Sequence, residues 1–177
     1  MSHSRISFVS RAVAALLVLG ATVLVPRVSV AQDLGIKVGA VAPGAPVELL
    51  DGKPTDLATM LAGKVTLMEF WATWCPNCKQ LEPAIKAVHA KYKDRVQFLA
   101  VAVSLNQSVD RVKAYQQRFG LPFTYVYDRR GDASEAYDAP ATSYVVIVDA
   151  TGKVAYTGVG GTQDLDGALS RVLGARR

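Results

Sequence analysis

The chain has 177 residues, and half of them are hydrophobic, which suits one globular domain with a sizeable core. Its formal net charge is +5, but the charged residues are scattered, and the sequence has no basic stripe with interleaved aromatic residues. The composition therefore gives nucleic-acid binding no support.

The first 31 residues have the composition of a secretory signal peptide. Arg5 and Arg11 form a positive N-terminal region, residues 12–25 are apolar, and Ser29-Val30-Ala31 is a small-residue cleavage site. The apolar run of about 14 residues is shorter than the roughly 20 needed to span a bilayer, although an uncleaved N-terminal membrane anchor is the alternative. We therefore expect a periplasmic or otherwise exported protein, cleaved after Ala31. Residues 32–177 then form the domain, with 17 basic and 15 acidic residues, because the leader carries three arginines and no acid.

From residue 32 onward, an irregular lead-in is followed by alternating strand and helix patterns. Runs of apolar, β-branched and aromatic residues predict strands over 47–50, 55–56, 65–72, 96–103, 124–127, 144–148 and 153–157. Helical spacing, capping residues and glycine stops predict helices over 57–62, 75–92, 108–119 and 164–173, a short helix ending at 137, and a loop over 158–161. This order predicts an α/β fold: a central mixed β-sheet flanked by helices, with an N-terminal β-hairpin extension.

The chain has two cysteines, Cys75 and Cys78, at the point where a predicted strand gives way to a helix. A thiol pair at this spacing can close an internal disulfide, and the positive end of a helix stabilises a thiolate at its first residue. In an oxidising compartment the pair could instead be a structural staple. A bridge across two residues, however, closes a loop too short to remove much entropy from the unfolded chain. The pattern therefore favours a redox-active pair.

The residues around this pair carry a family resemblance. The segment Phe70-Trp71-Ala72-Thr73-Trp74-Cys75-Pro76-Asn77-Cys78, with Lys79 and Leu81-Glu82-Pro83 after it, resembles the active-site strand and helix of thioredoxin-fold thiol–disulfide oxidoreductases. The leader, the lead-in hairpin and the helix inserted after the second core strand resemble the TlpA/ResA-like periplasmic branch. The resemblance implies a thioredoxin-like fold for residues 32–177. It also implies that Cys75 is the attacking thiolate, at an exposed helix end, and that Cys78 is the buried resolving thiol.

Glu69 and the residues beside the cysteines complete the predicted site. Glu69 interrupts an otherwise apolar strand, where an ionised carboxylate is unfavourable without a role or a partner. By resemblance it matches a buried acid that assists deprotonation of the resolving cysteine; the alternative is a solvated Glu69 at the sheet edge or an ion pair with Lys64. Trp74, Pro76 and Asn77 flank the cysteines and are expected to line a substrate groove. Neither Pro76 nor Asn77 adds a charge, which favours a moderately reducing protein over an extreme oxidant.

One position departs from the family. A cis-proline usually precedes the strand beside the cysteines, but counting back from Asp149 and Gly152 puts Ser143 there, after Thr142. Either the loop is shortened and Pro140 is the cis residue, or the cis-proline is absent, which the spacing favours. The Thr142–Ser143 bond is then expected to be trans, because a non-proline cis peptide costs about 2.5–4 kcal/mol. Thr142 and Ser143 would reshape the substrate groove, and the serine hydroxyl leaves room for a metal that proline would hinder.

These features predict an exported thiol–disulfide oxidoreductase of the disulfide reductase type that acts on protein thiol or disulfide clients, with no cofactor beyond the Cys75–Cys78 disulfide. The resemblance implies a membrane electron donor of the DsbD/CcdA type and clients such as apocytochrome c or copper-site cysteines in an oxidase. We expect a monomer without a metal. The alternatives are a Cu(I)-binding metallochaperone, with His89, Met60 and Met68 as thin further support, and a redox-inert thioredoxin-fold binding module.

Overall fold

The computed structural model describes residues 34–174, so the predicted signal peptide lies outside the described residues. The strands are β1 (Pro46–Leu49), β2 (Pro54–Asp56), β3 (Thr66–Trp71), β4 (Gln97–Val103), β5 (Thr124–Asp128), β6 (Tyr144–Val148) and β7 (Val154–Val159). The helices are α1 (Leu57–Leu61), α2 (Pro76–Tyr92), α3 (Val109–Phe119), α4 (Asp132–Ala136) and α5 (Leu165–Gly174). In residues 34–174, no helix is both long enough and apolar enough to cross a membrane.

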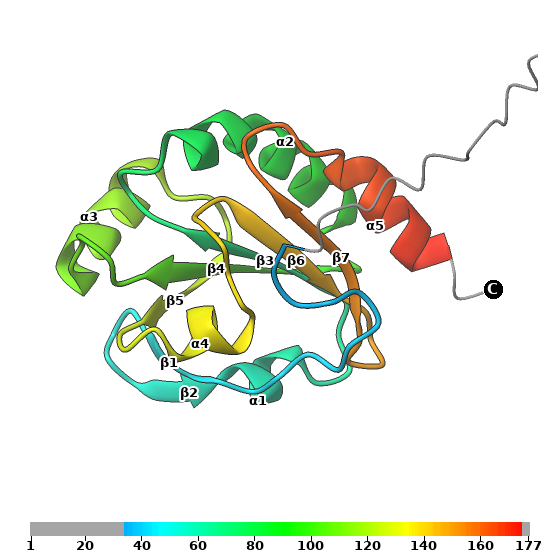
Figure 1. Ribbon diagram of the computed structural model, residues 1–177. Coiled ribbons are helices and arrows are strands. Elements are labelled where there is room, and N and C mark those ends of the chain that lie inside the picture. The colour runs from blue at the N-terminus through cyan, green and yellow to red at the C-terminus, as the bar shows by residue number, and fades with distance from the viewer. Residues whose placement is uncertain (1–33, 175–177) are drawn as a thin grey trace, which may run out of the picture. The chain divides into compact units, whose positions relative to one another are not determined.

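All seven strands belong to one mixed sheet, in the order β2-β1-β5-β4-β3-β6-β7 (Figure 1). The central strands β3, β4 and β5 run parallel, whereas β6 is antiparallel to β3 and β1 is antiparallel to β5. Helices α2 and α5 cover one face of the sheet, and α1 and α4 cover the other (Figure 1). The predicted mixed sheet flanked by helices is confirmed.

Strand β3 lies in the middle of the sheet and is buried over all six of its residues. Because side chains alternate along a strand, Leu67 and Trp71 pack on the α2 side, while Met68 and Phe70 pack on the α1 and α4 side. Burial of a large apolar side chain of this kind contributes about 1.5–3 kcal/mol. This rigid strand ends directly before the predicted cysteine motif, and so it fixes where that motif lies.

The two ends of the sheet differ from the predicted boundaries. The β1–β2 hairpin is present, but β1 also pairs with β5, so the hairpin is an integral edge of the sheet. Strand β7 continues to Val159, where a loop over 158–161 was expected. The strand continues because Gly158 and Val159 pair with Val145 and Tyr144, and this pairing satisfies backbone groups that a loop would leave to solvent.

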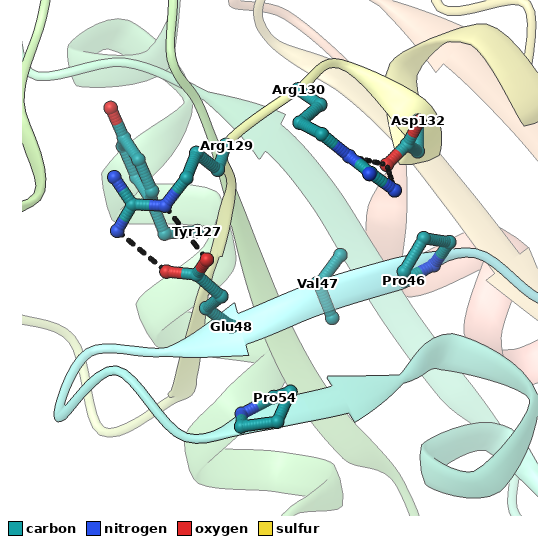
Figure 2. A pocket seen from close by; sticks show the side chains of 8 residues that line it. All are labelled: Pro46, Val47, Glu48, Pro54, Tyr127, Arg129, Arg130 and Asp132. Atoms are coloured by element: carbon teal, nitrogen blue, oxygen red, sulfur yellow. Dashed lines mark hydrogen bonds and ion pairs between the residues drawn. The ribbon is translucent and has the colours of Figure 1, made fainter.

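The turn after β5 is held by charged side chains. Asp128 is fully buried and accepts hydrogen bonds from the backbone N–H groups of Ala133 and Ser134. It therefore caps the N-terminus of α4, because the N-cap residue Gly131 has no side chain to do so. Arg129 donates from Nε and Nη2 to the two carboxylate oxygens of Glu48 on β1, at 2.7 and 2.6 Å (Figure 2). These bonds fasten the turn to the β1 edge of the sheet.

Candidate active site

Cys75 and Cys78 form a disulfide at the N-terminus of α2, with their Cα atoms 5.3 Å apart. Cys75 is the N-cap residue, and Pro76 is the first helical residue, where its missing N–H leaves no carbonyl unpaired. The backbone N–H of Cys78 donates to Cys75 Sγ at 3.0 Å. In the reduced protein the same N–H and the positive end of α2 favour a thiolate at Cys75.

The prediction that Cys75 lies exposed is wrong for this oxidised state. Cys75 is 1% exposed and Cys78 is 8% exposed, so both belong to the buried core on the α2 side of the sheet. The reason is that the disulfide and the Cys78 N–H hold the Cys75 sulfur against the first turn of the helix. Trp74, Pro76 and Asn77 beside it are exposed, as the groove prediction requires. These three exposed side chains therefore surround the buried sulfur of Cys75 on the protein surface.

The loop between β4 and α3 holds the residues just before Cys75. The Thr73 N–H donates to Gln107 Oε1 at 2.9 Å, and Trp74 Nε1 donates to the Leu105 carbonyl at 2.9 Å. Gln107 is buried, and its Nε2 donates to the Val103 carbonyl at the end of β4. Sequence reasoning missed Gln107, because a glutamine in a polar loop carries no motif; its role appears only when the fold brings the two loops together.

Glu69 is 4% exposed and lies between β4 and β6. The alternative of a solvated Glu69 at the sheet edge is therefore wrong, and so is the ion pair with Lys64, because Glu69 Oε1 is buried without a hydrogen-bond partner. The pKa of Glu69 is raised to about 8, mainly by burial and to a smaller extent by the negative charge of Glu82. A buried carboxyl with a pKa near neutrality is typical of a proton-transfer site.

Glu69 and Cys78 face the same small cavity, whose volume is about 30 Å³. Its lining consists of Glu69, Trp71, Cys78, Glu82, Ala100, Tyr115, Phe119, Leu121, Phe123 and Tyr125. A single water needs roughly 10–15 Å³, so the cavity has room for water between its polar groups. A water in this cavity could therefore carry a proton between the carboxyl group and the Cys78 thiol of the reduced protein.

Ser143 lies directly before β6, where the family pattern has its cis-proline. Every peptide bond in residues 34–174 is trans, so neither Pro140 nor Ser143 follows a cis bond. Ser143 has a φ of +63° and is fully buried. Its N–H donates to the Phe70 carbonyl at 2.8 Å, and its hydroxyl donates to the Gly160 carbonyl at 3.0 Å. Its own carbonyl accepts from the Gly160 N–H and from Gln163 Nε2, both at 3.1 Å.

The residues considered for copper binding do not gather around the cysteines. Met68 packs on the opposite face of the sheet, and His89 packs against the ring of Phe98 at a centroid distance of 4.9 Å. The Ser143 hydroxyl is engaged by Gly160. Across residues 34–174, no group of three or more His, Cys, Asp or Glu side chains is placed to hold a metal ion.

A larger hollow, of about 200 Å³, lies over β1, β2 and the turn after β5 (Figure 2). Neither cysteine lines it. Its two arginines, Arg129 and Arg130, are paired with Glu48 and Asp132. Because these charges are already matched by neighbouring acids, we place the chemistry at the cysteines and not in this hollow.

The arrangement as a whole, a cysteine pair at the start of a helix that follows the central strand of a mixed sheet, defines a thiol–disulfide oxidoreductase with a thioredoxin-like fold. Residues 29–172 match the Redoxin family, and the chain belongs to that family.

Individual relatives agree with this class. The chain is 32% identical over 124 residues to the thiol-disulfide oxidoreductase ResA of Geobacillus thermodenitrificans, and the matched region covers 70% of each chain. It is 30% identical over 124 residues to the thioredoxin-like protein YneN of Bacillus subtilis, across 70% of this chain and 72% of that one. It is also similar to the structure of a candidate thiol:disulfide interchange protein DsbE from Chlorobium tepidum, with a TM-score of 0.67, 26% identity, and coverage of 79% of this chain and 97% of that chain.

Proposed function

We propose that the protein is exported and that it reduces or exchanges disulfides in client proteins outside the cytoplasm. The observation that carries the proposal is the Cys75–Cys78 disulfide at the start of α2, beside a cavity that also holds the buried Glu69. The leader-like composition of residues 1–31 supports export. In this proposal Cys75 attacks, Cys78 resolves, and Glu69 accepts the proton of Cys78.

The first step forms a mixed disulfide. The Cys75 thiolate attacks one sulfur of a client disulfide, a bond forms between Cys75 Sγ and that sulfur, and the other client sulfur leaves as a thiolate. The Cys78 N–H, which donates to Cys75 Sγ in the oxidised protein, stabilises the attacking thiolate before the step.

The second step releases the client. Cys78 passes its thiol proton to the Glu69 carboxylate, and the resulting thiolate attacks Cys75 Sγ. The mixed disulfide breaks, the second client sulfur leaves as a thiolate, and the Cys75–Cys78 bond closes. Two electrons have then passed from the cysteine pair to the client. A dithiol donor is needed to return them, and a membrane donor of the DsbD/CcdA type suits this requirement.

The exposed surface around the disulfide is the proposed client groove. Trp74, Pro76 and Asn77 are exposed on one side of the sulfur atoms, and Thr142 is half-buried directly before Ser143. Trp74 is held in place by the bond from its indole N–H to Leu105. We propose that a cysteine-containing client segment, such as that of apocytochrome c or of a copper-site protein, lies against this surface.

Trapping of the mixed disulfide tests the function. Cys78→Ser should accumulate mixed disulfides with clients from a periplasmic extract, because the second step is blocked, and mass spectrometry should place each bond at Cys75. Cys75→Ser is the matched control and should trap nothing, since it lacks the attacking thiol. The proposal fails if the two variants trap equally and the unmutated protein shows no measurable dithiol–disulfide couple.

A further inference from the structure

We propose that Glu82 holds the proton on Glu69 and connects its cavity to solvent, and that Lys86 opposes this effect of Glu82. Together the two residues set the pH range in which Cys78 resolves a mixed disulfide. Glu82 is a positioning residue in this scheme, because it acts through Glu69 and not on sulfur. The consequence for resolution rests on the proposed function, whereas the coupling between the two carboxyl groups can be measured without it.

The geometry of α2 puts Glu82 in this place. Glu82 follows Cys78 by four residues, so the two side chains lie one helical turn apart on the same face. Both line the 30 Å³ cavity that Glu69 faces. The Glu82 side chain is 23% exposed, in contrast to the buried Glu69, so it contacts the cavity and the solvent at once. Glu82 is therefore a polar link between the buried carboxyl and the surface.

The elements packed around Glu69 supply few compensating charges. On the sheet, Glu69 is paired with Ala100 of β4 and Val145 of β6, which are both apolar. Helix α3 and strand β5 contribute Tyr115 and Tyr125 to the cavity lining. Helix α2 contributes Cys78 and Glu82, which complete the titratable groups of the lining. Lys86, one turn further along α2, is outside the lining and acts on this group through its ion pair with Glu82.

Lys86 is already bound to Glu82. Its Nζ lies 2.5 Å from Glu82 Oε1, in an i, i+4 pair along α2. The negative charge of Glu82 raises the pKa of Glu69, and it also raises the pKa of Tyr115, on which Lys86 acts in the opposite direction. Glu82 therefore favours the protonated form of Glu69, and Lys86 weakens that effect.

This arrangement gives the proton a route out of the protein. Each resolution step leaves one proton on Glu69, and that proton must leave before the next turnover. Glu69 is only 4% exposed, but the cavity has room for water, and the half-buried Glu82 extends from the cavity lining to the surface. The proton that Cys78 gives up thus passes through Glu69 and then to solvent beside Glu82.

Two substitutions with opposite expected signs test the coupling. In the oxidised protein, carbon-13 NMR of labelled glutamate side chains follows the titration of Glu69. Glu82→Gln removes the negative charge and should lower the Glu69 midpoint, whereas Lys86→Met frees Glu82 from its counter-charge and should raise it. Glu135→Gln is the matched control and should leave the midpoint unchanged, because Glu135 is an exposed residue of α4 on the other face of the sheet.

The same variants predict the rate of resolution, measured in a single turnover from a preformed mixed disulfide. Below the midpoint, a drop of half a pKa unit increases ionised Glu69 about threefold, so Glu82→Gln should resolve about threefold faster at pH 7. Lys86→Met should be slower. A general loss of packing would slow both variants and could not produce opposite signs.

The outcomes are distinguishable. If the Glu69 midpoint stays fixed, or moves in the same direction in both variants, the coupling is refuted whatever the activity. If the midpoints move as expected but the rates do not follow, Glu69 is not the proton acceptor and the control of resolution is refuted. Neither result bears on the trapping experiment at Cys75, which together with the dithiol–disulfide couple of the unmutated protein tests the proposed function separately.

Discussion

The raised pKa of Glu69 makes the stability of the oxidised protein depend on pH, and Glu69→Gln should remove that dependence. Below pH 4.5, the ordinary pKa of the carboxyl, folded and unfolded chains both carry the proton, so Glu69 has no unfavourable effect. Above about pH 8 both are ionised, and the folded chain contains a buried charge. Stability contributed by the neutral carboxyl is therefore lost as the pH rises from 4.5 to about 8.

The size of this effect follows from the two pKa values. The difference between a pKa of 4.5 and one of about 8 corresponds to a loss of folding free energy of about 5 kcal/mol, at roughly 1.36 kcal/mol per pKa unit. About 4 kcal/mol of this loss falls between about pH 5 and pH 9. Because Glu69 is only 4% exposed, solvent screens little of the penalty for the buried charge. Glutamine has nearly the same shape and no charge to lose. Its own desolvation penalty is the same at every pH.

Guanidinium unfolding of the oxidised protein at pH 5, 7 and 9 measures this difference. The unmutated protein should lose several kcal/mol more than Glu69→Gln across that range, which is about 4 kcal/mol if the carboxyl stays in its cavity. Glu135→Gln, whose side chain is exposed, should follow the unmutated protein. Parallel stability curves for the unmutated protein and Glu69→Gln would contradict the assignment of a buried, protonated Glu69.

Three further substitutions test the supports of the site. Ser143→Pro should destabilise the protein by about 3 kcal/mol or more in chemical unfolding, because proline cannot reach a φ of +63° and removes the bond to Phe70. Ser143→Gly should stay within about 1 kcal/mol, since glycine adopts this backbone freely and loses only the hydroxyl bond. Gln107→Ala should cost about 1–3 kcal/mol and accelerate amide hydrogen exchange at Thr73, whose N–H loses its acceptor; unchanged exchange would contradict that anchoring role.

The central part of the fold could be predicted because its pattern is local. The apolar run of β3, the capping Ser108 and the proline at the start of α2 each fix a structure within a few residues, and the structure contains all three. The cysteine pair could be located for the same reason, since its spacing and its place at a helix start lie in one continuous segment. Strong local signals therefore predicted the position of the cysteine pair as well as the scaffold.

The rest of the site depends on contacts between distant segments. Gln107 is 34 residues from Thr73, and Ser143 is 20 residues from Gln163, so no spacing rule links either pair. The burial of Cys75 follows from how the disulfide lies against the helix, which composition does not encode. The sequence shows Glu82 only as part of the cysteine motif, because its effect on Glu69 arises through a cavity that exists only after α2 packs on β3.

The two edges of the sheet have a consequence for how this protein meets other chains. The outer strand β2 is three residues long and begins with Pro54, which has no N–H to offer. On the opposite edge, Gly39 and Ala40 of the lead-in segment exchange hydrogen bonds with Val154 at the start of β7. Strand addition, the common route to self-association and fibre growth, is thus disfavoured at β2 and at the start of β7. In the proposed function, client chains therefore meet a redox surface, while β2 and the start of β7 remain poor templates for co-aggregation.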